Sequence, residues 1–429
     1  MIREFKAYLD GAHSSYHAVA QLVQMLENDG YFCLPENQSW ELIPGEKYYM
    51  TRGMSSLVAF RIPERTPTGF MMTAAHSDRP SFKLKEDGEL TGEYLRASVE
   101  KYGGSVLSTW LDRPLSVAGR VVVETPNGIE SKLIDIDRDL LLIPNVAIHM
   151  ERTVNDGKKW NPAVDLLPLA GDGEKRGELQ ALLERYAGGS ILGSDLYLYV
   201  RQPASVWGVA EEYISAQGLD DLACVWCCAQ GFLGADDSSA VPVLCVFDHE
   251  EVGSGSPVGA DSQLLAGVLH RICDSLDLDE MQMLSQSFLL SADNAHALHP
   301  NHPEYGDAHH APKLNGGVVL KYHAGMNYTT DGVSAGLFRK ICEMADVPVQ
   351  IYYNRGDLPG GSTLGRLSAA HVSVPTADIG LAQLAMHSCY ETLGVQDVAS
   401  MADAVRTYYG CALENIGDGS YELRWCVAE

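Results

Sequence analysis

Four apolar segments of the chain each run without interruption into polar or charged residues. They are residues 69–75, 241–247, 287–292 and 347–353, and they lead into His76-Ser77-Asp78, Asp248-His249-Glu250-Glu251, Asp293 and Asn354-Arg355-Gly356-Asp357. An unbroken apolar run is typical of a strand that is buried on both faces, as in a parallel sheet. Because open α/β sheets bind ligands outside the carboxyl ends of their strands, the pattern predicts an α/β fold with four polar strand ends at one edge.

Both ends of the chain carry helical patterns. Near the amino terminus, apolar residues share one face of a predicted helix: Val19, Leu22, Met25 and Leu26. Ser14-Ser15 can cap this helix and Gly30 can end it. Between residues 398 and 409, apolar residues again recur at helical spacing, which favours a helix that docks on the core over a binding surface.

The middle of the chain has a different pattern of apolar and polar residues. Short strand candidates at residues 115–123 and 132–136 are followed by a charged, glycine-containing stretch, and helical periodicity returns only at residues 178–186. We therefore predict an inserted, mostly β domain at residues 85–205, which interrupts an α/β catalytic domain made of residues 1–84 and 206–429. Since polar strand ends precede and follow the insertion, its two flanks must meet in one fold.

Composition narrows the class of protein. The 429 residues are 46% hydrophobic and 21% charged, which is ordinary for a globular protein. No apolar stretch approaches the roughly 20 residues that span a bilayer, so no membrane span is expected. The net charge of -26 argues against binding to nucleic acid or to an anionic membrane surface. The mixed charge of the first six residues does not resemble a signal peptide, and a cytoplasmic location is expected.

The ten cysteines fit a reducing compartment, because most of them lie inside apolar runs. Cys224-Val225-Trp226-Cys227 has the spacing of a redox or zinc-knuckle motif. It lies in an apolar stretch without a second pair that would complete a tetrahedral zinc site. A buried helix is therefore the favoured interpretation of this segment.

The strand ends hold the side chains of a candidate two-metal centre. His76 is a good imidazole ligand, and Asp78 can orient its other ring nitrogen. Glu250 and Glu251 point to different sides of the chain, so one can bind a metal while the other acts as a base. Asp293 can complete one ligand set, although a solvated loop is the commoner fate of any one such strand end.

Two further ligand candidates come from later segments. Asp220 and Asp221 precede an apolar helix, where a carboxylate is either a cap or a ligand. His387 follows the apolar stretch at residues 377–382, and a core or capping histidine is the commoner role at such a place. Other histidines are rivals for it, notably His149, His296, His299, His309 and His310.

At these residues the chain resembles the aspartyl aminopeptidase family of zinc metallopeptidases, over nearly its whole length. Seven segments in order carry the resemblance: Ala75-His76-Ser77-Asp78, Val99-Glu100-Lys101-Tyr102-Gly103-Gly104, Leu219-Asp220-Asp221-Leu222, Glu250-Glu251-Val252-Gly253-Ser254, SADNAHALHPNHPEY from Ser291, GSTLG from Gly361 and QLAMHS from Gln383. The resemblance implies a mixed-sheet catalytic domain with an inserted, mostly β dimerisation domain.

The resemblance also implies roles for single residues. Around one Zn2+ it puts His76, Asp220 and Asp293, and around the second it puts Asp220, Glu251 and His387. It makes Glu250 the general base and Asp78 the support of His76. The residues implied to touch substrate are His149, His296 and Lys321. His149 would reach the site of a neighbouring subunit, and it can alternatively be counted as a metal ligand or an interface residue.

Three positions depart from the family pattern. Gly218 stands where an Arg is usual, Asp221 replaces the usual Asn, and Gly360 replaces a common Cys. None of these changes removes an implied ligand. Asp221 adds a negative charge beside the bridging Asp220.

The function expected from these residues is a zinc-dependent aminopeptidase. A metal-bridging water, activated by Glu250, would attack the first peptide bond of an unblocked peptide, and Asp357 would hold the free α-ammonium group. Lys321 and Arg355 are the basic groups that would favour acidic N-terminal residues. The alternatives are a dinuclear carboxypeptidase or deacylase and, outside enzymes, a metal-stabilised peptide-binding scaffold.

Catalysis does not strictly require the predicted insertion, so subunit contacts explain it best. The family resemblance points to a homo-oligomer in which dimers form a closed shell, a dodecamer. Peptides are the expected substrates, and neither nucleic acid nor a membrane is an expected partner.

Overall fold

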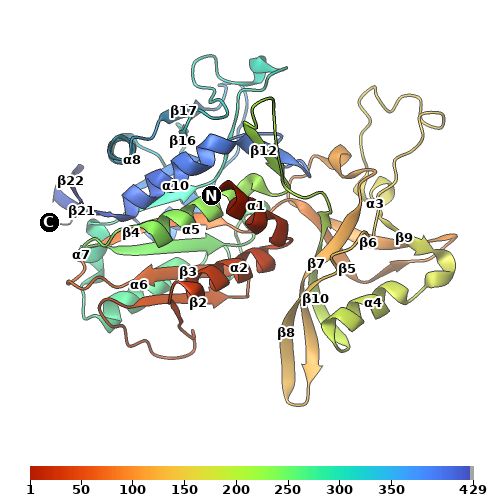
Figure 1. Ribbon diagram of the computed structural model, residues 1–429, viewed down its shortest axis with the longest axis horizontal. Helices are drawn as coiled ribbons and strands as arrows, with labels where there is room; N and C mark the ends of the chain where they lie inside the picture. Colours follow the sequence, from red (N-terminus) through yellow and green to blue (C-terminus); the bar gives the residue numbers. More distant parts are fainter. Residues whose placement is uncertain (426–429) are drawn as a thin grey trace.

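The computed structural model describes residues 1–425, and a mixed nine-stranded sheet lies at its centre (Figure 1). In spatial order the strands are β1 (Phe32–Cys33), β2 (Lys47–Arg52), β3 (Ser56–Arg61), β13 (Val241–Phe247), β4 (Phe70–His76), β14 (Phe288–Ala292), β18 (Thr376–Gly380), β16 (Val318–Tyr322) and β17 (Val349–Tyr353). The predicted α/β fold is confirmed, and strands from distant parts of the sequence are neighbours.

Three of the four predicted strand ends do meet at one edge. β4 is parallel to both β13 and β14, and Phe247 at the end of β13 is paired with His76 at the end of β4. The prediction is wrong for β17. It is parallel to β16, which is antiparallel to β18, so β17 runs against β4, β13 and β14. An apolar run indicates burial on both faces and contains no information about strand direction.

Helices cover both faces of this sheet because its central strands are apolar on both sides. Along β13, Leu244 and Val246 belong to one core, and Val243 and Cys245 belong to the other. The first core is closed by α1 (Ile2–Gly11), α2 (Ser15–Asn28), α5 (Leu219–Gly234), α8 (Gly332–Met344) and α10 (Val395–Tyr409). The second is closed by α6 (Leu264–Ser275), α7 (Glu280–Ser285) and α9 (Leu364–His371).

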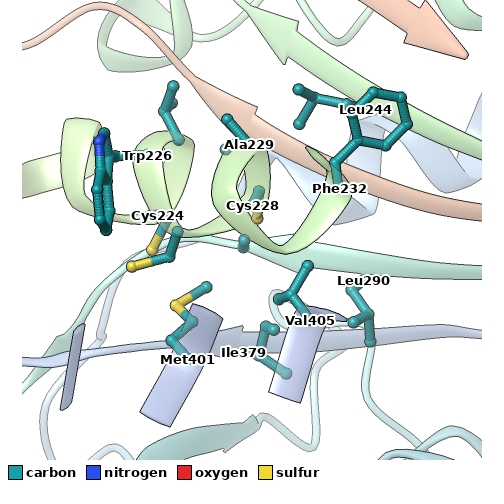
Figure 2. Close-up of a cluster of buried hydrophobic side chains, with 14 of the residues drawn as sticks. Cys224, Trp226, Cys228, Ala229, Phe232, Leu244, Leu290, Ile379, Met401 and Val405 are labelled. Atoms are coloured by element: carbon teal, nitrogen blue, oxygen red, sulfur yellow. The ribbon is translucent and has the colours of Figure 1, made fainter. Parts of the chain in front are cut away.

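Helix α5 is apolar around its whole circumference, as expected of a helix in the middle of a core. Figure 2 shows α5, with Trp226, Cys228 and Phe232, between Leu244 on one side and Leu290, Met401 and Val405 on the other. The interpretation of Cys224-Val225-Trp226-Cys227 as a buried helix is confirmed, because both cysteines are free and buried. This packing fixes the start of α5, where Asp220 lies.

The predicted terminal helices are also confirmed. Ser14 caps α2 and accepts a hydrogen bond from the backbone N–H of His17 at 3.4 Å. α10 packs its apolar residues into the first core, as predicted for a docking helix. The helix α1 was not predicted from the sequence. No described helix has the length and apolarity that crossing a membrane requires.

A second lobe, on the right in Figure 1, is built around a six-stranded sheet. Its strands are, in spatial order, β8 (Gly128–Asp135), β7 (Leu115–Thr125), β10 (Ile191–Val200), β5 (Ser81–Leu90), β6 (Tyr94–Tyr102) and β9 (Leu169–Asp172). The helix α4 (Glu178–Ala187) packs on this sheet and contributes Leu179, Leu182 and Leu183 to a separate core. The chain enters the lobe at β5 and leaves it after β10. The short helix α3 (Pro162–Asp165) lies in the same part of the chain.

A small third sheet connects the site segments. Its strands are β11 (Ser205–Trp207), β12 (Tyr213–Ala216), β20 (Glu391–Gly394), β19 (Ala382–Leu384) and β15 (Ala295–His296). β12 leads into α5, β15 follows Asp293, and the loop between β19 and β20 contains His387. The remaining elements are the hairpin β21 (Cys411–Gly417) and β22 (Ser420–Trp425) and the 3-10 helices η1 (Leu107–Trp110), η2 (Gly173–Lys175), η3 (Glu250–Val252) and η4 (Pro303–Tyr305).

Candidate metal centre

Two groups of possible metal donors meet beyond the ends of β4, β13 and β14. His76, Asp220 and Asp293 form the first group, in which the donor atoms all lie within 4.8 Å of one another. Asp220, Glu251 and His387 form the second group by the same measure. Asp220, at the start of the buried helix α5, belongs to both groups. The structure thus brings together all five residues that the sequence suggested as ligands.

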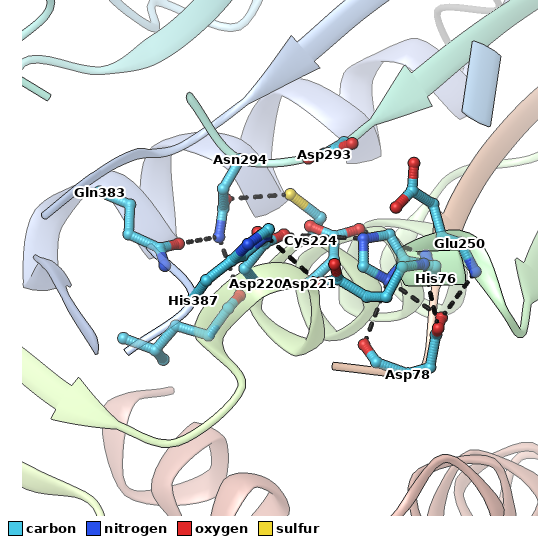
Figure 3. Close-up of polar contacts among 12 residues, drawn as sticks. His76, Asp78, Asp220, Asp221, Cys224, Glu250, Asp293, Asn294, Gln383 and His387 are labelled. Atoms are coloured by element: carbon cyan, nitrogen blue, oxygen red, sulfur yellow. Dashed lines mark hydrogen bonds and ion pairs between the residues drawn. The ribbon is translucent and has the colours of Figure 1, made fainter. Parts of the chain in front are cut away.

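The donor atoms of the five residues converge, and several of them are within ion-pair distance of one another. His76 Nε2 lies 3.6 Å from Asp220 Oδ1, and His387 Nε2 lies 3.3 Å from Asp220 Oδ2 and 3.4 Å from Glu251 Oε1 (Figure 3). Within residues 1–425, Asp220 Oδ1 and Glu251 Oε1 are buried and have no hydrogen-bond partner. Buried carboxylate oxygens are costly unless something pairs with them. Imidazole nitrogens and carboxylate oxygens are zinc ligands, so these residues fit Zn2+.

The electrostatics of the centre favour a cation. Burial raises the pKa of Asp293 to about 6 and that of Glu250 to about 8, and it raises the pKa of Glu251 as well. Burial also opposes charging of His387, but hydrogen bonding to Asp220 and the charge of Glu251 outweigh it and raise its pKa to about 10. A bound cation lowers the pKa values of these carboxyl groups again, because it stabilises the carboxylates in their charged form.

Glu250 lies beside the donor groups without belonging to either. Its side chain lines the same cavity, of about 180 Å³, as His76, Asp220 and Glu251. In Figure 3 its carboxylate points away from Asp78.

Asp78 supports both sides of the centre. Its Oδ1 lies 3.3 Å from Nδ1 of His76, as expected for the support of that ligand. In addition, Oδ1 accepts the backbone N–H of Glu250 at 3.1 Å, and Oδ2 accepts that of Glu251 at 3.2 Å. The hydroxyl of Tyr102 donates to Oδ2 at 2.6 Å. One carboxylate therefore orients His76 and fixes the backbone of the two adjacent glutamates.

The suggested substrate residues fall into two sets. His296 and Lys321 line the cavity of the metal centre. Lys321 is buried, and its Nζ donates to the backbone oxygen of Asp293 at 2.6 Å and lies 3.7 Å from the Asp293 carboxylate. His149 is exposed between β8 and α3, and Asp357 is exposed and forms an ion pair with Arg355 at 2.8 Å. Neither His149 nor Asp357 lines the cavity within this chain.

The structure accounts for glycine at position 218. The residue has a φ of +69°, and a Cβ added to it would lie 2.4 Å from Cδ of Arg79. The buried guanidinium of Arg79 donates to the backbone oxygen of Ala12 at 2.6 Å. Arg79 therefore fills the space beneath the turn that leads to Asp220.

Gly218→Ala is expected to destabilise the fold by more than the about 1–2 kcal/mol that a left-handed backbone costs an L residue, because Arg79 must also move. Gly188→Ala is the matched control, since Gly188 has a φ of +71° and nothing within 4 Å of the added Cβ. Urea unfolding of both variants measures the difference. Equal losses of unfolding free energy would show that contact with Arg79 does not matter.

Asp221 is buried and is not a member of either donor group. Its Oδ2 accepts the backbone N–H of His76 at 3.3 Å. Burial raises the pKa of this carboxyl group well above its usual range. Asp221, the additional acidic residue beside Asp220, therefore has a structural role, because it holds the backbone at the end of β4 where His76 lies.

One residue of the centre escaped the sequence analysis. Glu391, the first residue of β20, is buried and accepts the backbone N–H groups of Asp220 and His387. Its only signal in the sequence is an acidic side chain four residues after His387, in a segment that otherwise reads as a short strand.

Comparison with known proteins identifies relatives over most of the length of the chain. Residues 8–409 match the family model described as aminopeptidase I zinc metalloprotease (M18). A probable M18 family aminopeptidase 2 of Clostridium novyi is 42% identical over 400 residues, which are 90% of this chain and 92% of the relative. A protein of the same description from Pseudomonas entomophila is 39% identical over 94% of this chain and 96% of its own length.

Solved structures show the same fold. The cryo-EM structure of the Ape4 and Nbr1 complex aligns with a TM-score of 0.91 and 34% sequence identity, over 95% of this chain and 84% of that chain. The structure of the mApe1 dodecamer of S. cerevisiae aligns with a TM-score of 0.84 and 25% identity, over 95% of each chain.

Fold, donor groups and family model together define the class of this protein, which is a zinc metalloprotease. Within that class, the chain belongs to the M18 family of aminopeptidases, which are hydrolases acting on peptides. The alternatives of a carboxypeptidase, a deacylase or a scaffold without activity are thereby set aside.

Proposed function

We propose that this aminopeptidase uses two zinc ions to remove N-terminal residues, with a preference for acidic ones, from unblocked peptides. The observation that carries the proposal is the sharing of Asp220 between two donor groups, with the carboxylate of Glu250 beside them and outside both. A structural metal site closes all its coordination positions and needs no spare carboxylate.

In the proposed mechanism His76, Asp220 and Asp293 hold one ion, and Asp220, Glu251 and His387 hold the other. Zinc supplies Lewis-acid chemistry there, which polarises a carbonyl and makes a nucleophilic water available at neutral pH. The Glu250 carboxylate takes a proton from the attacking water and passes it to the amine of the leaving peptide. Asp78 keeps Glu250 in place through its backbone N–H, at 3.1 Å.

The preference for acidic residues is supported by a second cavity, of about 320 Å³, next to the first. His296 and Tyr352 line both cavities. The second one is also lined by His299, His302 and Arg355, and no Asp or Glu is among its lining residues in the described chain. In a protein with a net charge of -26, the imidazole and guanidinium donors that line this cavity favour an acidic group, although Arg355 and His302 also pair with the carboxylates of Asp357 and Glu304.

Lys321 and Arg355 play unequal parts in this preference. The ammonium group of Lys321 is tied to Asp293 and Asn294 by hydrogen bonds of 2.6 and 3.2 Å to their backbone oxygens. Arg355 lines the second cavity while it is paired with Asp357. We therefore propose that Arg355 and the histidines attract the acidic side chain, and that Lys321 stabilises the segment of Asp293.

Chromogenic amides of Asp, Glu and Leu provide the test of this function. The wild-type enzyme is expected to cleave amides with a free α-amino group, and to do so only when zinc is present. Its kcat/KM is expected to be higher for the Asp and Glu amides than for the Leu amide. N-acetylated forms are expected to remain uncut. A chelator should abolish cleavage and zinc should restore it. Equal rates for Asp and Leu amides would refute the acidic preference, and cleavage of the acetylated amides would refute the aminopeptidase mechanism.

We also propose that the chain assembles into a homo-oligomer, a dodecamer built from dimers. The related mApe1 of S. cerevisiae is described as a dodecamer. In this chain, the lobe that carries β5 to β10 has its own core and contributes no donor to either metal group, so subunit contacts are a role open to it. The exposed segment with His149 lies in the same lobe.

A further inference from the structure

Glu391 contacts two candidate metal ligands through their backbones. The side chain is 1% exposed. Its Oε2 accepts the N–H of Asp220 at 3.0 Å, and its Oε1 accepts the N–H of His387 at 2.6 Å. Asp220 and His387 are members of the same donor group. A single carboxylate thus binds the backbones of Asp220 and His387, whose side chains converge in the second donor group.

Both of these backbones lie outside regular structure. His387 belongs to the loop between β19 and β20 and has a φ of +66°, which an L side chain rarely adopts. Asp220 has φ and ψ of -86° and 104°, which are not helical although α5 begins at Leu219. Neither N–H is bonded within a helix or a strand ladder. The buried carboxyl group of Glu391 supplies the acceptor that each of these N–H groups would otherwise lack.

The small third sheet explains why Glu391 can reach both. β20 pairs with β12, and Glu391 is opposite Ala216, four residues before Asp220. β20 also pairs with β19, and the loop between them carries His387. The sheet therefore brings the turn before α5 and the loop of His387 to the two sides of one side chain.

Asp78 binds the backbone of the third member of this donor group. It accepts the N–H of Glu251, the remaining member of the second donor group, at 3.2 Å. All three ligands of this group therefore have their backbone N–H groups fixed by one of two buried carboxylates. Residues that orient metal ligands in this way are part of a metal site, and their loss typically lowers affinity or activity about 10- to 100-fold.

We propose that Glu391 is the positioning residue of the second zinc, holding Asp220 and His387 so that their side chains meet at one ion. The inference rests on the proposed two-zinc function. An amide in its place has one good acceptor, and its NH2 group would face a backbone N–H, so one of the two anchors is lost.

Glu391→Gln tests the proposal by zinc titration against a chelator, with zinc per subunit measured by elemental analysis. The affinity for one zinc of the pair is expected to fall about 10- to 100-fold, while the other ion stays bound. At limiting zinc, kcat should fall with KM unchanged, and excess zinc should restore it. Unchanged affinity for both ions would overturn the proposal. Wild-type protein that binds fewer than two ions would instead overturn the two-zinc function itself.

Asp397→Asn is the matched control. Asp397 is also a buried carboxylate that accepts two backbone N–H groups, from Asn315 at 2.6 Å and from Gly317 at 2.8 Å, but it belongs to neither donor group. Its variant is expected to lose stability and to keep both zinc affinities. An equal loss of zinc affinity in Asp397→Asn would mean that Glu391 acts only through general stability.

A measurement on wild-type protein covers the case in which Glu391→Gln does not fold. Amide hydrogen exchange of the zinc-stripped protein should show slow exchange at Asp220 and His387, because the carboxylate holds these groups without metal. Fast exchange at both amides, in a protein whose β4 and β14 stay protected, would refute the role of Glu391.

Discussion

Glu250→Gln is expected to lower kcat by roughly 10² to 10⁴ while both zinc ions stay bound. Glu250 lines the cavity of the metal centre but is a member of neither donor group. Glutamine keeps the shape of the side chain and cannot accept and return a proton. Steady-state kinetics on an Asp or Glu amide, combined with zinc per subunit, measures the effect.

The neighbouring variant Glu251→Gln distinguishes the two glutamates. Glu251 belongs to the second donor group, so its variant should lose zinc affinity together with rate. The assignment of Glu250 as the base is untenable if a zinc-replete Glu250→Gln protein turns over at the wild-type rate, or if the two variants lose zinc equally.

Asp220→Ala is expected to abolish activity through loss of both ions. Asp220 is the one residue that belongs to both donor groups, with its two oxygens near His76 and His387 respectively. Its removal should therefore lower the affinity for both zinc ions. The loss should exceed the roughly 10- to 100-fold that is typical when a residue that only orients a metal ligand is changed. Elemental analysis and chelator competition measure this directly.

Asp221→Asn is the control for this variant, because Asp221 is the adjacent buried carboxylate and lies outside both groups. It should keep zinc, and asparagine can still accept the N–H of His76. Two bound zinc ions in Asp220→Ala, or loss of zinc only in Asp221→Asn, would contradict the sharing of Asp220.

Much of the fold followed from local patterns. The apolar runs of β4, β13 and β14 were predictable because a strand buried on both faces must be apolar at successive positions. The start of α2 was predictable because Ser14 is a good cap. The direction of β17 was not, since its apolar run is compatible with either orientation, and tertiary pairing with β16 set it.

The candidate site was predictable to a similar degree. His76 and Asp293 directly follow apolar runs and Glu250 comes three residues after one, so their presence at a strand end was visible in the sequence. The choice of His387 among the histidines came from the family resemblance, and the structure brings it to Asp220 and Glu251. Lys321 is tied to the backbone of Asp293, which no local pattern indicates.

The sequence by itself determined which segments are buried and which chemical groups are available, because burial periodicity and side-chain chemistry are local properties. Only the tertiary structure decided that Asp220 is shared, that Arg79 occupies the space beside Gly218, and that Glu391 reaches two ligands at once. The physical reason is that these contacts join residues far apart in the chain. Their distances depend on how sheets and helices pack, and no neighbouring residue specifies them.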